Sequence, residues 1–196
     1  MKKNKCRCFW CGDDPLYVKY HDHEWGEPVR DDQKLFEQLT LEGAQAGLSW
    51  LIILRKRQNY RKAFAQFNPP KVARFTKSKI DKLILNEGIV RHRGKIISTV
   101  NNAKIFLSIQ KEHGSFSHWL WGHARENKIH HPLNSPTSAL ALKISKDLKK
   151  RGMKFVGPSI IHAFLQAVGV FSDHQPNCWK FTKKVPRGAL PSKSFN

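Results

Sequence analysis

Residues 83–96 read Leu-Ile-Leu-Asn-Glu-Gly-Ile-Val-Arg-His-Arg-Gly-Lys-Ile. An apolar helix runs into Gly88, a short apolar turn and Gly94, and a basic helix follows. Glycines let the backbone approach a phosphate closely, and the next helix offers free N–H groups at its positive end. Arg91, Arg93 and Lys95 add charge. The pattern alone fits a helix-hairpin-helix that grips DNA and an ordinary turn between two helices with a basic rim equally well, and the net charge of +20 favours the first.

The chain on both sides of this stretch is also predicted to be helical. Apolar residues recur at helical spacing behind capping residues or a Gly-Pro pair. The helices expected from this pattern cover about 31–46, 49–67, 76–88, 94–111, 138–151 and 157–168. Residues 113–136 are expected to be irregular with one short helix, and no strand or internal repeat is expected. We therefore predict an all-α fold, with one helical domain over 1–181 and a basic, mobile tail over 182–196.

The charge of the chain points to a polyanionic partner. Thirty-five Lys and Arg residues face fifteen acidic residues, a net charge of +20. This balance favours nucleic acid first and an acidic membrane surface second, while a merely solvated basic surface is the alternative. No apolar run approaches the roughly 18 residues of a membrane span. The start Met-Lys-Lys-Asn-Lys has no apolar signal region after it. We expect a cytoplasmic protein with no membrane partner.

Cysteine and histidine are concentrated near the two ends of the chain. His174 and Cys178 form a His-x3-Cys pair, which is half of a tetrahedral zinc site. The N-terminal candidates for the other half are Cys6, Cys8, Cys11, His21 and His23. Four cysteines are too few for a disulfide scaffold, which indicates a reducing compartment. The spacing predicts one structural zinc that joins the two ends; buried or idle cysteines, or a catalytic cysteine, are the alternatives.

Aromatic residues crowd the segment 15–50. It holds Tyr17, Tyr20, Trp25, Glu42 and Trp50. Enzymes that act on a base take it out of the stack and hold it between aromatic faces, and a carboxylate can accept hydrogen bonds from its exocyclic amine. A charge near the end of an apolar helix needs a reason. The alternatives are that these rings are core and that Glu42 is exposed at the surface.

Five ordered blocks of the sequence carry a more specific signal. They are Asp14-Pro15-Leu16-Tyr17, residues 20–26 (YHDHEWG), residues 41–50 (LEGAQAGLSW), residues 88–96 (GIVRHRGKI) and Lys154-Phe155-Val156-Gly157. Together they resemble the constitutive type I family of bacterial 3-methyladenine DNA glycosylases. The resemblance runs from about Cys8 to Cys178 and does not cover the tail.

The resemblance implies a helix-hairpin-helix glycosylase bundle with a zinc site joining its N- and C-terminal segments. The implied zinc ligands are Cys8, His21, His174 and Cys178. The implied base pocket holds Trp10, Tyr17, Tyr20, Trp25, Trp50 and the catalytic Glu42. The implied DNA contacts are Gly88, Val90, Arg91, Arg93, Gly94 and Lys95. Cys6 and Cys11 have no implied role, although a Cys8-x2-Cys11 pair could compete for the metal.

The implied reaction is hydrolysis of the N-glycosidic bond of 3-methyladenine in alkylated double-stranded DNA. The implied product is free 3-methyladenine. No lysine nucleophile is implied, so we expect a monofunctional enzyme. The resemblance also leads us to expect a monomer located at the bacterial nucleoid. Relatives in the superfamily carry an Asp after the hairpin, but no Asp lies between Asp81 and Asp147, which agrees with the type I family. Asn68 replaces an Asp and is expected to cap its turn equally well. A non-enzymatic DNA-binding module and a catalytic zinc hydrolase are the rival interpretations.

Overall fold

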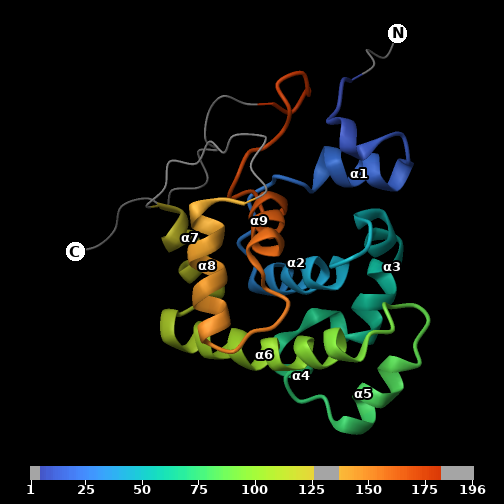
Figure 1. Ribbon diagram of the computed structural model, residues 1–196, viewed down its shortest axis with the longest axis vertical. Helices are drawn as coiled ribbons and strands as arrows, with labels where there is room; N and C mark the ends of the chain where they lie inside the picture. Colours follow the sequence, from blue (N-terminus) through green and yellow to red (C-terminus); the bar gives the residue numbers. More distant parts are fainter. Residues whose placement is uncertain (1–4, 126–136, 182–196) are drawn as a thin grey trace.

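The computed structural model describes residues 5–125 and 137–181, and these form an all-helical arrangement (Figure 1). The α-helices are α1 (Pro15–His23), α2 (Asp32–Gln45), α3 (Trp50–Ala63), α4 (Pro69–Val72), α5 (Lys77–Ile84), α6 (Arg93–His113), α7 (Phe116–Arg125), α8 (Ala139–Lys150) and α9 (Pro158–Ala167). Two 3-10 turns, η1 (Phe9–Cys11) and η2 (Ala65–Phe67), complete them. The described ranges contain no strand, so the all-α prediction is confirmed. The predicted tail and residues 126–136 lie outside these ranges.

The end of α3 differs from the sequence expectation. The helix expected over 49–67 ends at Ala63, because Ala65, Gln66 and Phe67 adopt φ angles of 51°, 55° and 57°. A right-handed helix cannot continue through this left-handed stretch. The stretch places the ring of Phe67 6.1 Å from that of Phe64, and both rings are fully buried. Burial of the aromatic ring therefore outweighs the local helical preference.

Two helices were not expected, and each begins at a capped proline. Asp14 accepts hydrogen bonds from the N–H groups of Leu16 and Tyr17, and Pro15 begins α1. Asn68 accepts from the N–H of Lys71 in the same way at the start of α4. Proline is well tolerated in a first helical turn because its missing N–H has no intrahelical partner there. These prolines open helices as well as ending the segments before them.

Helix α2 lies in the middle of the arrangement, where it packs against α3, α6, α7 and α9 (Figure 1). Its apolar face, with Leu35, Phe36 and Leu39, is buried, and the ring of Phe36 lies 5.2 Å from that of Phe106 on α6. At its N-terminal end, Asp32 accepts hydrogen bonds from the N–H groups of Phe116 and Ser117 and so holds α7. Glu42 occupies the last turns of this central helix.

The predicted hairpin is the connection 85–92 between α5 and α6, and it packs on α3. The N–H of Val90 donates to the hydroxyl of Tyr60 at 3.1 Å. A Cβ at Gly88 would lie 2.9 Å from Cβ of Asn59, so a side chain at this position would collide with α3. His92 caps α6 by accepting from the N–H of Lys95. In the described part of the chain, no helix combines the length and the apolar character that a membrane crossing needs.

The end of α9 fixes the segment that connects α1 to α2. The N–H of Gly26 donates to the carbonyl of Ala167, and that of Val29 donates to the carbonyl of Val168. Gly169 follows with a φ of 74°. A Cβ on this glycine would lie 2.5 Å from the backbone of Glu27 and Pro28. The close approach of the two chains therefore requires glycine.

Replacing Gly169 should destabilise the protein more than replacing a matched glycine. Gly114 has a similar φ of 78°, but a Cβ there meets nothing within 4 Å. Both changes to alanine should cost about 1–2 kcal/mol for the left-handed backbone. Gly169→Ala should cost about 1–3 kcal/mol more for the steric conflict. Urea denaturation measures the free energy of unfolding, and equal losses in the two variants would refute the close contact.

Candidate functional site

Two cysteines and two histidines converge where the two ends of the domain meet. The ligand atoms of Cys8, His21, His174 and Cys178 all lie within 4.8 Å of one another, and all four side chains are buried. Cys8 Sγ lies 3.5 Å from His174 Nδ1, and Cys178 Sγ lies 3.4 Å from His21 Nε2. We call these four residues the Cys/His cluster. Four such side chains can hold one metal ion between them.

The surroundings of the cluster orient its ligands. His21 Nδ1, on the far side of the ring, lies 2.8 Å from Asp22 Oδ1. Asp22 in turn accepts two hydrogen bonds from Arg7, whose guanidinium holds the pKa of this carboxyl well below its usual range. A carboxylate on the second nitrogen of a metal-binding histidine fixes the ring and its tautomer. Sequence reasoning missed Asp22, although its position directly after a predicted ligand was a signal.

Backbone contacts join the two chain segments around the cluster. The N–H of Phe9 donates to Gln175 Oε1 at 2.9 Å, and the N–H of Trp179 donates to the carbonyl of Cys6 at 2.9 Å. The competing candidates lie apart from the ligand atoms: Cys11 is buried with its thiol near the carbonyl of Gly12, and Cys6 is exposed. The predicted four residues are therefore the ones that the fold brings together.

A chain of aromatic rings extends from the Cys/His cluster to Trp50. Trp25 lies 4.7 Å from His174 between ring centroids, and Trp10 lies 5.2 Å from His21. The remaining contacts are Trp10–Trp25 at 4.9 Å, Trp10–Tyr17 at 5.2 Å, Tyr17–Tyr20 at 6.5 Å and Tyr20–Trp50 at 5.4 Å. Tyr20 and Trp50 are buried, whereas the other three rings are half-buried. We call these five rings the aromatic cluster.

Glu42 is buried beside this aromatic cluster, with 5% of its surface exposed. This excludes the alternative that it is exposed at the surface. Its Oε1 accepts a hydrogen bond of 2.8 Å from Gln38, which also lies 3.5 Å from the hydroxyl of Tyr20. Burial raises the pKa of Glu42 to about 8, against the opposing effect of the Gln38 hydrogen bond. Gln38 was not predicted, although its place one helical turn before Glu42 was a signal.

Trp50 contributes a polar atom as well as a ring. Its indole N–H is buried, and within the described residues it has no hydrogen-bond partner. Buried donors are normally paired, so an unpaired one in this aromatic cluster indicates a place where a polar ligand binds.

The predicted DNA-contact residues fall into two groups. Arg91 and Arg93 are exposed, and they pair with Glu87 at 3.3 Å and Asp81 at 3.2 Å. Exposed pairs of this kind contribute little stability, so both guanidinium groups remain available to a phosphate. Lys95 is different: its amine donates to the carbonyls of Ala44 at 2.9 Å and Ala46 at 2.6 Å. A phosphate contact by Lys95 would require these two hydrogen bonds to break.

Gly88, Val90 and Gly94 lie at or beside the hairpin, as predicted, but the packing gives each glycine a reason within the protein. Gly88 adjoins Asn59, and a Cβ at Gly94 would lie 3.0 Å from the ring of His92. Val90 is half-buried, and its N–H is used by Tyr60. The glycines therefore serve tight packing, whether or not a phosphate also approaches them.

The Cys/His cluster should hold one metal ion per chain. Cys178→Ala removes a ligand and should lower the metal content and the melting temperature together. Cys11→Ala is the matched control, because it also removes a buried thiol but lies outside the cluster. Elemental analysis and thermal melting measure the two quantities. Full metal content in Cys178→Ala, or its loss in Cys11→Ala, would contradict the assignment.

Comparison with known proteins agrees with this geometry. The sequence model of the family described as methyladenine glycosylase matches residues 10–181. The chain is 44% identical over 177 residues to a DNA-3-methyladenine glycosylase of Haemophilus influenzae, covering 88% of this chain and 96% of the relative. It is also 44% identical over 189 residues to DNA-3-methyladenine glycosylase 1 of Escherichia coli, covering 92% and 99%.

A solved structure extends the comparison to the fold. It describes 3-methyladenine recognition by 3-methyladenine DNA glycosylase I from Staphylococcus aureus. The two chains superpose with a TM-score of 0.84 at 40% identity, over 91% of this chain and 97% of the other. Sequence and fold therefore agree over nearly the whole described chain, and this protein belongs to the methyladenine glycosylase family.

Proposed function

We propose that this protein removes 3-methyladenine from alkylated double-stranded DNA by hydrolysing its N-glycosidic bond. The observation that carries the proposal is the buried carboxyl of Glu42 beside the aromatic cluster, in a chain that belongs to this family. The named relatives support the choice of base, since they are 3-methyladenine glycosylases. The net charge of +20 supports DNA as the partner.

Base recognition follows from the chemistry of these side chains. Methylation at N3 leaves the base in DNA positively charged, which makes it a good leaving group and attracts it to electron-rich ring faces. Trp50 and Tyr17 offer such faces, and stacking contributes on the order of 1–3 kcal/mol per base. Extrusion from the duplex costs a few kcal/mol, and less at a damaged pair. Glu42 accepts hydrogen bonds from the exocyclic amine, and the Trp50 N–H donates to a ring nitrogen.

Glu42 should dominate the affinity for the free base. Glu42→Gln keeps the shape of the side chain but removes the carboxylate, and hydrogen bonds to charged groups contribute about 1.5–3 kcal/mol, or roughly ten- to a hundredfold in binding. Glu37→Gln is the matched control, because Glu37 lies on the same helix but pairs with Arg61. Calorimetry with 3-methyladenine measures both variants. Parental affinity in Glu42→Gln would reject the role of the carboxyl in base recognition.

The raised pKa of Glu42 predicts how base binding depends on pH. With a pKa of about 8, Glu42 is neutral in the free protein at pH 7. Binding through the carboxylate must therefore release a proton, so affinity should increase from pH 6 to pH 8, by up to about tenfold per unit, and then level off. The ratio of the parental affinity to that of Glu42→Gln cancels ionisation of the base itself. A ratio that stays flat or falls as pH rises would show that the carboxylate is not the binding form.

We propose that the hairpin grips the phosphate backbone beside the extruded base, which makes α5, the hairpin and α6 a helix-hairpin-helix unit. Arg91 and Arg93 carry most of this role, since they are exposed and only weakly paired. Gly88, Val90 and Gly94 shape the turn. A grip on phosphate is independent of sequence, which suits an enzyme that must search all of the DNA for a damaged base.

We propose that the metal of the Cys/His cluster is zinc and that its role is structural. Zinc in a tetrahedral site lies about 2.3 Å from sulfur and about 2.0 Å from nitrogen, which puts the sulfur and nitrogen ligands about 3.5 Å apart. The sulfur–nitrogen distances of 3.4, 3.5 and 3.6 Å fit this geometry. Four protein ligands fill the tetrahedron, whereas a catalytic zinc keeps a position for water. This argues against the rival zinc hydrolase.

A further inference from the structure

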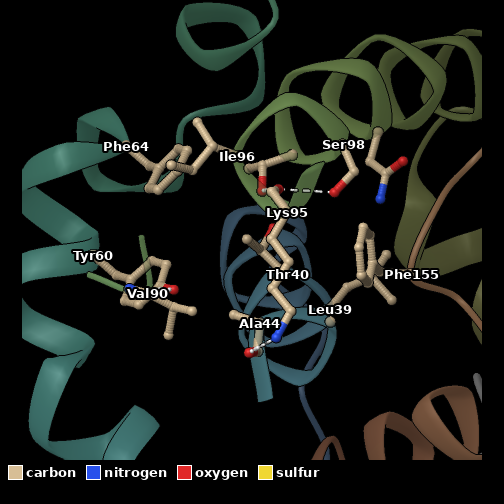
Figure 2. Close-up of a pocket in the computed structure, with 13 residues that line it drawn as sticks. Leu39, Thr40, Ala44, Tyr60, Phe64, Val90, Lys95, Ile96, Ser98 and Phe155 are labelled. Atoms are coloured by element: carbon tan, nitrogen blue, oxygen red, sulfur yellow. Dashed lines mark hydrogen bonds between the residues drawn. The ribbon is translucent and has the colours of Figure 1, made fainter. Parts of the chain in front are cut away.

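Lys95 lies at a junction between the hairpin and the helix that carries Glu42. Its side chain runs from the start of α6 to the end of α2, where the amine donates to the carbonyl of Ala44 (Figure 2). The amine also donates to the carbonyl of Ala46. The last carbonyls of a helix have no intrahelical partners, and a cation there also interacts favourably with the helix dipole. The amine is half-buried, and this burial lowers its pKa. Lys95 therefore caps the C-terminal end of α2.

Because Lys95 belongs to α6, its cap on α2 joins the two helices. It lies in the first turn of α6, directly after the hairpin, and its N–H donates to the capping side chain of His92. Its carbonyl accepts hydrogen bonds from the hydroxyls of Ser98 and Thr99. The backbone of Lys95 is thus fixed to α6 while its amine is fixed to α2, in the turn that follows Glu42.

Phe155 makes a second contact across the same junction. It is not a glycine, yet its φ is 55°, a left-handed conformation that side chains rarely adopt. Its carbonyl oxygen lies 3.2 Å from where a Cβ of Gly43 would be, and its ring lies 6.0 Å from that of His92. One residue therefore lies against the neighbour of Glu42 and against the end of the hairpin, and a Cβ at position 43 would fit tightly against its backbone.

The junction is closely packed. Figure 2 shows the Lys95 side chain running to Ala44 at the end of α2, with Tyr60 of α3 on one side and Phe155 on the other. The cavity between these elements measures about 20 Å³. That is room for about one water molecule, so no base can bind there. The two hydrogen bonds of the Lys95 amine join the end of α2 to the start of α6.

We infer that Lys95 is a positioning residue, which sets the Glu42 carboxyl relative to the DNA-gripping hairpin instead of contacting phosphate itself. The inference rests on the proposed function, because it assigns the hairpin to the DNA backbone and Glu42 to the base. A base that is extruded while its phosphates are held at the hairpin must reach Glu42 at a fixed distance. Lys95 and Phe155 set that distance.

Three measurements on Lys95→Met test this role. They are the affinity for free 3-methyladenine, the salt dependence of binding to undamaged duplex, and the single-turnover release of 3-methyladenine from methylated duplex. Both binding properties should stay near parental values. Release should fall by about ten- to a hundredfold, because small misplacements of reacting groups cost this much. Lys95→Arg, which keeps the charge and the donors, should restore most of the rate.

Two further variants provide the comparison. Lys104→Met removes the same charge from an exposed position of α6 and should match the parent in all three measurements. Arg91→Ala should reduce the salt slope by about one, because it removes one phosphate contact. If Lys95→Met does not fold, Lys95→Gln is measured in its place.

The outcomes separate the inference from the proposed function. A parent that releases no 3-methyladenine refutes the proposed function. If the parent is active, a parental release rate in Lys95→Met overturns the positioning role. A salt slope reduced as in Arg91→Ala would make Lys95 a phosphate ligand. If Lys95→Met loses affinity for the free base and also melts at a lower temperature than the parent, Lys95 serves only the stability of the fold. Either this result or the reduced salt slope would overturn the inference.

Discussion

The burial of one carboxyl, that of Glu42, is the constraint around which this structure is arranged. An ionised carboxylate in an apolar surrounding is unfavourable, and the raised pKa of about 8 expresses that cost. The protein keeps the group on the central helix α2, and among the described residues it gives this carboxyl one donor, Gln38. The indole N–H of Trp50, which has no partner in the same described ranges, lies in the same aromatic surroundings. In the proposed function, an amine-bearing, positively charged base supplies what the site lacks, namely donors for the carboxyl, an acceptor for the indole and a charge that favours ionisation.

The aromatic cluster depends on the Cys/His cluster for its position. Trp10 and Trp25 pack against the imidazoles of His21 and His174, and these two histidines come from opposite ends of the described chain. A metal ion in the Cys/His cluster would therefore fix two rings of the proposed base site at once. The metal would not contact the base; it would hold the histidines against which the two rings pack.

Side-chain type and spacing predicted much of this site, but not its backbone partners. Spacing predicted that His174 and Cys178 would meet an N-terminal pair, and the family resemblance selected Cys8 and His21 from the five N-terminal candidates; the fold brings these four together. Helical periodicity predicted the long helices. It missed α1 and α4, which are short and begin at prolines. The burial of Glu42 and the destination of the Lys95 amine depend on how distant elements pack, and backbone carbonyls leave no signature in a sequence. Lys95 therefore looked like one more basic residue of the hairpin.

The central claim is that this chain binds alkylated DNA and breaks the bond to one damaged base. The most direct test is to incubate methylated duplex DNA with the full chain and identify the bases set free by chromatography. The account predicts release of 3-methyladenine, without strand cleavage. Tight binding to the same DNA with no base released would contradict it, and would leave the protein as a DNA-binding module whose aromatic residues serve only as core.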